Sequence, residues 1–206
     1  MKSYQVYGLG NAIVDLVARV DDSFLAKHSF SKGSSTLVTP LIKEGLLSEI
    51  KQGHHEIRMS PGGSVANSLA IIADVRGKTA FSGRVADDHL GNFYREEFRN
   101  IGVHFGNPLI VGDGHTGVCV VLATPDGERT MRAALGTSTA FGPDDVTTHL
   151  IRSSHWLFLE GYLLANGARG QEAFELAIRD ARNSPTPTKI ALSLSSDFVA
   201  NQERAF

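Results

Sequence analysis

Polar residues and a pair of glycines stand at the ends of several apolar runs in this sequence. Asn11 follows the first run, Asp15 is embedded in the second, and Glu160 closes a later one. The glycine pair 62–63 forms a loop that opens a helix, and Asn67 falls in the first turn of that helix. Ligands of open α/β sheets bind beyond the carboxyl ends of the strands, so these positions are candidates for one binding site.

Carboxylates and amides held on rigid elements are suited to a polyhydroxylated ligand such as a ribose, because each hydroxyl needs an acceptor. Gly62 and Gly63, which lack a Cβ, would let backbone N–H groups come close to the ring oxygens. In the structural alternative, Asp15 caps a turn, the glycines only open a helix, and Glu160 is solvated. For any one of these residues, the structural explanation is as good as a functional one. Taken together, however, the positions favour a substrate site.

Several other chemistries are not supported by the motifs. The stretch at residues 8–13 begins like a dinucleotide-binding fingerprint, but Ile13 stands where the third glycine is needed, which opposes an NAD-binding oxidoreductase. The sequence has no P-loop and no Gly-x-Ser-x-Gly elbow. His54 and His55 are adjacent and cannot share a helical face, so no metal site is predicted.

Composition narrows the class of protein and its partners. The 206 residues carry 20 basic and 22 acidic side chains, without a block of like charges, so neither nucleic acid nor a membrane surface is the expected partner. A small molecule is expected instead. The single cysteine, Cys119, cannot form an internal disulfide, and no signal peptide or long apolar span is visible. A cytoplasmic location is therefore predicted.

The elements that must position these residues alternate along the chain. Short apolar runs predict buried strands, and segments with one apolar face predict helices. The expected strands are 6–10, 12–20, 79–83, 155–161 and 189–195, and the expected helices are 42–50, 64–73, 87–98 and 170–182. This alternation predicts an α/β fold with an open, mostly parallel sheet and helices on both faces.

One hairpin interrupts the alternation. Residues 116–123 and 128–132 flank Pro125-Asp126-Gly127, which is a strong turn signal. We predict a small β-lid built from this hairpin, residues 116–132, together with the extended segments 14–20 and 35–39. The lid could leave the protein a monomer or join two copies as a homodimer.

Two stretches of the sequence carry a family resemblance. Gly-Gly-Ser-Val-Ala-Asn-Ser-Leu-Ala at residues 62–70, followed by Gly-Arg-Val-Ala-Asp-Asp-His-Leu-Gly at 83–91, resembles the N-terminal signature of the PfkB-type carbohydrate kinases, the ribokinase and adenosine kinase superfamily. Residues 10–15 and the turn at 125–131 are similar to other parts of that family. The resemblance covers the chain from about residue 4 to its end and implies a ribokinase-like fold.

The resemblance also implies an activity and roles for the residues. The family transfers a phosphoryl group from ATP, with Mg²⁺, to a sugar or nucleoside hydroxymethyl group, and the turn favours an adenosine-like nucleoside. It places Asp15, Gly62, Gly63 and Asn67 around the sugar, beneath a closing lid. Arg132 corresponds to a place where relatives can carry a phosphate-facing basic residue, with a solvated lid arginine as the alternative. Glu160 resembles the position where some relatives place a polar group that binds substrate or takes part in a metal relay.

The family's second signature, Gly-Ala-Gly-Asp at a helix N-terminus, is not found, so no catalytic residue is assigned. That stretch would supply the anion hole and the aspartate that deprotonates the acceptor hydroxyl. We therefore expect residues 1–206 to be an incomplete ribokinase-like domain without its C-terminal nucleotide-binding half. An incomplete record of a kinase is favoured over a catalytically inactive sugar- or nucleoside-binding fragment and over a domain completed by another chain.

Overall fold

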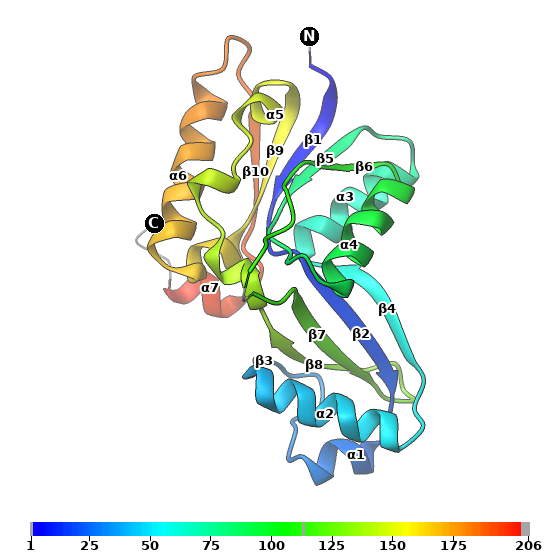
Figure 1. The fold of residues 1–206 in the computed structure, drawn as a ribbon. Coiled ribbons are helices and arrows are strands. Elements are labelled where there is room, and N and C mark those ends of the chain that lie inside the picture. The colour runs from blue at the N-terminus through cyan, green and yellow to red at the C-terminus, as the bar shows by residue number, and fades with distance from the viewer. Residues whose placement is uncertain (1, 113, 203–206) are drawn as a thin grey trace.

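The computed structural model describes residues 2–112 and 114–202, and a five-stranded parallel sheet forms its centre. The strand order is β10-β9-β1-β5-β6, and every neighbouring pair is parallel (Figure 1). The strands are β1 (Tyr4–Leu9), β5 (Thr79–Ser82), β6 (Val103–Phe105), β9 (Ser154–Glu160) and β10 (Lys189–Ser193). The predicted fold class is confirmed, although the short strand β6 was not predicted.

Helices cover both faces of this first sheet, as the right-handed connections of parallel strands require. On one face lie α3 (Ser64–Asp74) and α4 (His89–Asn100), which bury Leu69 and Phe98 against Phe81. On the other face lie α5 (Thr148–Arg152) and α6 (Ala168–Arg182). The buried side chains of α6, such as Phe174, pack with Leu157 of β9. The molecule thus has two hydrophobic clusters, one on each side of the sheet.

A second, mixed sheet projects from the first (Figure 1). Its strand order is β3-β8-β7-β2-β4, with the β2–β7 and β3–β8 pairs parallel and the β2–β4 and β7–β8 pairs antiparallel. The strands are β2 (Ile13–Arg19), β3 (Ser35–Leu37), β4 (Ile57–Gly62), β7 (Gly117–Ala123) and β8 (Arg129–Ala134). All the segments predicted for the β-lid belong to this sheet.

Strand β4 is the main difference from the sequence prediction, which left residues 57–61 without a strand. Pro61 has no N–H to donate and is normally confined to edge strands. In the structure β4 is an edge strand paired only with β2, so Pro61 lies opposite Val14 at no cost to a central ladder. The proline therefore hid a real strand from a prediction based on the local pattern.

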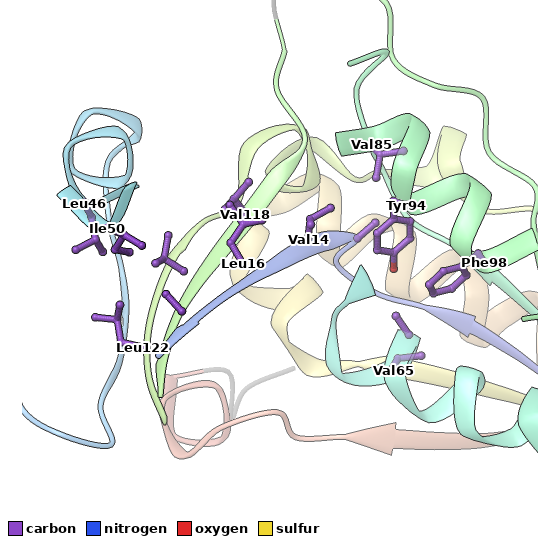
Figure 2. Close-up of a cluster of buried hydrophobic side chains, with 14 of the residues drawn as sticks. Val14, Leu16, Leu46, Ile50, Val65, Val85, Tyr94, Phe98, Val118 and Leu122 are labelled. Carbon is purple, nitrogen blue, oxygen red and sulfur yellow. The ribbon is translucent and has the colours of Figure 1, made fainter. Parts of the chain in front are cut away.

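One face of the second sheet is covered by two helices, α1 (Asp22–Lys27) and α2 (Pro40–Gln52). Figure 2 shows Leu46 and Ile50 of α2 beside Leu122 of β7. The side chain of Thr39 accepts a hydrogen bond from the N–H of Ile42 and so caps the start of α2. Burial of these aliphatic side chains fixes α2 on this face and leaves the other face open.

The remaining elements are short. They are the 3₁₀ turns η1 (Gly136–Ala140), η2 (Pro143–Asp145) and η3 (Gly161–Asn166), and the helix α7 (Asp197–Gln202). The predicted domain, residues 1–206, also includes residues 1, 113 and 203–206, which lie outside the described residues. No helix within the described part of the chain has the length and apolarity needed to cross a bilayer.

Candidate functional site

The candidate site lies where the chain passes between the two sheets. Residues 10–12 carry the chain from β1 into β2, and Gly63 carries it from β4 back to α3. Because Ile13 pairs with Gly62, these two crossings lie side by side. Residues 8–10 lead into a strand and not into a helix, so the geometry of a dinucleotide-binding fingerprint is absent here.

Asp15 lies on the face of the second sheet that α1 and α2 leave open. Its register partners are Ser60 and Cys119, and residues paired across strands point to the same face. The carboxylate is half-buried, and no hydrogen-bond donor reaches it from the described residues. Burial raises the pKa of Asp15 to about 6, against the opposing charge of Arg129. It is therefore a partly dehydrated acceptor without a protein donor.

The chain packs so closely around the Asp15 carboxylate that positions 62 and 63 have room only for glycine. A Cβ on Gly62 would overlap the carboxylate of Asp15, and a Cβ on Gly63 would overlap the carbonyl oxygen of Asn11. Gly63 also has a φ of 111°, which residues with a side chain rarely adopt. The carbonyl oxygen of Gly62 accepts a hydrogen bond of 3.2 Å from the hydroxyl of Tyr94. The diglycine is thus held directly against Asp15.

Asn67 lies in the first turn of α3, with an exposed side chain. Its backbone N–H donates to the carbonyl oxygen of Gly63 at 2.8 Å, which places it one helical turn from the diglycine. The structure therefore brings Asp15, Gly62, Gly63 and Asn67 to one location, with the amide of Asn67 free of steric cover.

Glu160 is deeply buried at the end of β9, so the alternative of a solvated side chain is wrong. It is 1% exposed, and both of its carboxylate oxygens accept hydrogen bonds from the protein. The N–H of Asn11 donates to one oxygen, and the N–H and hydroxyl of Ser64 donate to the other. Burial raises the pKa of Glu160, and these three donors oppose that rise. Both oxygens of Glu160 thus accept hydrogen bonds from the protein itself, and the substrate role of Glu160 stays a prediction.

Asn11 is also occupied by the protein. The residue is 3% exposed, and its side-chain oxygen accepts a hydrogen bond of 3.1 Å from the amide of Asn166. The same Asn166 amide donates to the carbonyl oxygen of Ser138 at 3.1 Å. The backbone of Asn11 lies beside the diglycine. Its side chain links the connection between β1 and β2 to Asn166 of η3. The side-chain oxygen of Asn11 is therefore engaged by the protein, and a substrate role for this residue stays a prediction.

Arg132 lies on the opposite face of the second sheet from Asp15. It pairs with Val120, which pairs with Leu16, and these residues form the covered face. Arg132 is 4% exposed, its guanidinium donates to the carbonyl oxygen and hydroxyl of Ser34, and it lies 4.0 Å from the centre of the Phe30 ring. This corrects both alternatives from the sequence, because the side chain is neither solvated nor directed toward the site.

Three contributors to the site were missed by the sequence analysis. Asn166 holds Asn11, Tyr94 holds Gly62, and Cys119 lies beside Asp15. Burial, reinforced by the Asp15 charge, raises the pKa of the Cys119 thiol to about 12, so the thiol stays protonated. The apolar face of its helix predicts that Tyr94 is buried. The local sequence does not predict that its hydroxyl bonds to Gly62, which is 32 residues away.

No group of three or more His, Cys, Asp and Glu side chains that could hold a metal ion occurs in residues 2–112 and 114–202. The described side chains therefore do not fit a Mg²⁺ site of their own. What they do offer is a half-buried carboxylate, a diglycine and an amide around one open position. Such an arrangement can bind and orient a hydroxylated molecule.

Known proteins share the fold of this chain. The adenosine kinase from Sinorhizobium meliloti superimposes with a TM-score of 0.89 and 34% identity, covering 100% of this chain and 60% of that one. A probable sugar kinase from Rhizobium etli CFN 42 gives a TM-score of 0.89 and 30% identity with the same coverage. Guanosine-inosine kinase from Escherichia coli (strain K12) is 26% identical over 200 residues, 94% of this chain and 45% of that protein.

The chain spans less than half the length of this curated relative and 60% of the two solved structures. A family model described as pfkB family carbohydrate kinase matches residues 38–202. This match covers well over half of the chain and confirms the resemblance drawn from residues 62–70 and 83–91. The chain belongs to the pfkB family of carbohydrate kinases.

Proposed function

We propose that this chain forms the acceptor-binding part of an ATP-dependent kinase that phosphorylates the hydroxymethyl group of a nucleoside or sugar. An adenosine-like nucleoside is the favoured acceptor. The observation that carries the proposal is Asp15, a half-buried carboxylate that lies against Gly62 and receives no hydrogen bond from the described residues. A carboxylate in that state is prepared for hydroxyl donors from a ligand.

The site explains how a ribose would be held. The two oxygens of Asp15 can accept hydrogen bonds from two neighbouring hydroxyls, and bonds to a charged acceptor are stronger than neutral ones. Gly62 leaves room for the sugar to approach the backbone, since no Cβ stands beside the carboxylate. The exposed Asn67 adds an amide at the rim of the site. The open face of the second sheet would act as a lid over the ligand.

The names of the relatives support a nucleoside over a simple sugar. Adenosine kinase from Sinorhizobium meliloti and guanosine-inosine kinase from Escherichia coli both act on purine nucleosides by name. A probable sugar kinase from Rhizobium etli CFN 42 shares the fold at a similar level, so sugars stay in the test set.

ATP and Mg²⁺ enter the proposal through the family alone. When bound, they supply the phosphoryl group and neutralise its charge. We assign no residue of this chain to either of them, because the described side chains include no metal-binding cluster. The chain's own residues contribute binding, orientation and partial dehydration of the acceptor. A cytoplasmic location and a monomer or lid-mediated homodimer stay predictions.

The test is ADP release by the product of the complete gene. Adenosine, inosine, ribose, fructose and 2-keto-3-deoxygluconate are each supplied with Mg·ATP, and we expect the highest kcat/KM with adenosine. Turnover with none of them would overturn the kinase proposal. Ligand-dependent thermal stabilisation without ADP release would favour the binding-only alternative.

A further inference from the structure

Helix α3 begins at the site without a cap of its own. Its N-cap residue is Gly63, which has no side chain to accept a hydrogen bond from the first turn. N–H groups that lack an acceptor at a helix start are costly, and they attract negative charge because of the helix dipole. The carboxylate of Glu160, distant in sequence, fills this role by accepting from the N–H of Ser64 at 3.1 Å and from its hydroxyl at 2.5 Å.

The same carboxylate also holds the other crossing. Its second oxygen accepts a hydrogen bond from the backbone N–H of Asn11, the residue that leads into β2. Gly10 lies so close to Glu160 that a Cβ there would overlap the carboxylate. One buried group at the end of β9 therefore binds the chain at its exit from the first sheet and at its return.

Asp88 repeats this arrangement at a neighbouring crossing. Its side chain caps α4 through the N–H of Gly91 at 2.7 Å, and it accepts from the N–H and hydroxyl of Thr116 at 2.8 and 2.7 Å. Thr116 directly precedes β7, whose first residue, Gly117, pairs with Ile13 of β2. Strands β2 and β7, which are neighbours in the second sheet, are thus each tied to a helix cap at the point where they begin.

We propose that Glu160 is a positioning residue, a carboxylate clamp that fixes Asp15 and the diglycine relative to each other by binding Asn11 and Ser64 together. Its contribution to acceptor recognition rests on the proposed function. The clamp itself is a property of the unliganded protein. In the unliganded protein, both oxygens of Glu160 accept hydrogen bonds from the residues that it positions.

The first test is amide hydrogen exchange of the unliganded protein, followed by NMR. Glu160→Gln keeps the size of the side chain but has one carbonyl oxygen for two backbone donors. We expect the amides of Asn11 and Ser64 to exchange about tenfold faster, or more, because at least one of them loses its acceptor. Asp88→Asn is the matched control and should accelerate Gly91 and Thr116 instead. Unchanged exchange at Asn11 and Ser64 would overturn the clamp.

The second test is nucleoside affinity by calorimetric titration. Glu160→Gln should weaken adenosine binding about tenfold through misplacement of Asp15 and the diglycine. Ser64→Ala removes the hydroxyl at an exposed position but keeps the backbone N–H, and it should weaken adenosine binding about threefold. This variant replaces Glu160→Gln in the test if Glu160→Gln does not fold. Asp180→Asn removes the charge that Asp180 of α6 contributes to its ion pair with Arg152 of α5, and it should leave affinity unchanged.

The outcomes separate the two proposals. If exchange is faster in Glu160→Gln but adenosine affinity is unchanged, the hydrogen bonds of Glu160 have only a local effect. That result would overturn its positioning role. A wild-type protein that binds none of the tested nucleosides or sugars would overturn the proposed function, and the recognition role of Glu160 with it. The exchange measurement would still decide whether the clamp exists.

Discussion

Two carboxylates approach the diglycine from different sheets, and their surroundings differ. Glu160, at the end of β9 in the first sheet, is fully buried and accepts hydrogen bonds from Asn11 and Ser64. Asp15, in β2 of the second sheet, is half-buried, and the described residues give it no hydrogen-bond donor. A satisfied buried carboxylate holds structure, whereas an unsatisfied one at an open face is available to a ligand.

The comparison shows why residue type and proximity do not decide a role. Both residues are acids, both lie beside the glycines, and burial raises the pKa of both. The difference is whether the protein itself supplies the donors. Four predictions test this difference.

The largest effect is expected for substitution of Asp15. Asp15→Asn should weaken adenosine binding about 100-fold, because the amide can accept fewer hydroxyl hydrogen bonds and carries no charge. Calorimetric titration measures the change. Asp22→Asn on the exposed helix α1 is the matched control and should bind as wild type. Equal affinity of Asp15→Asn and wild type would assign Asp15 to structure.

Stability should respond in opposite directions at the two carboxylates. Glu160→Gln should lower the free energy of unfolding by about 2 kcal/mol, since one backbone donor is left unpaired in a buried site. Asp15→Asn should raise it at neutral pH, because burial disfavours the ionised form of Asp15. Urea denaturation tests both predictions, with the same dependence of unfolding free energy on urea concentration assumed for all variants. Two losses of similar size would remove the distinction drawn between the residues.

The pH dependence follows from the raised pKa of Asp15, which is about 6. Protonation below that value removes the charge, so adenosine affinity should fall about tenfold from about pH 7.5 to about pH 5. A raised folded-state pKa favours the folded state at low pH. Accordingly, wild-type stability relative to Asp15→Asn should decrease as pH rises from about 4 to about 6.

Asp15→Asn serves as its own control for this titration. Its adenosine affinity should show no step near pH 6, because the neutral amide does not ionise in that range. A step of equal size in the variant would assign the titration to another group.

The smallest effect on binding is expected at Arg132. Arg132→Met should leave adenosine affinity within about twofold of wild type, because the guanidinium lies on the covered face of the sheet. It should lower stability by about 1 kcal/mol through loss of the bonds to Ser34. Titration and urea denaturation of the same sample provide both values. A large loss of affinity at unchanged stability would restore the site role predicted from the sequence.

Much of the first sheet could be predicted because its signals are local. Apolar runs such as 155–161 and one-sided helices such as 170–182 bury their side chains in place, so their periodicity survives in the sequence. Strand β4 could not be predicted, since Pro61 and Gly62 resemble a loop and only pairing with β2 makes the segment a strand.

The candidate site divides in the same way. Gly62, Gly63 and Asn67 could be predicted as one group because they lie in a continuous family motif, and Asp15 could be predicted because it lies in a second short stretch, residues 10–15, that resembles the family. The partners of Asn11 and Glu160 were not found, because Asn166 and Ser64 meet them across separations of 155 and 96 residues. No local pattern carries such a contact.

The sequence by itself determined the α/β class, the family and the positions of Asp15 and the diglycine, since each is written in a contiguous stretch. The tertiary structure alone decided which carboxylate is free and which face of β8 carries Arg132. Strand register sets both, and a shift of one residue reverses every side chain of a strand. That register is fixed by packing between distant segments.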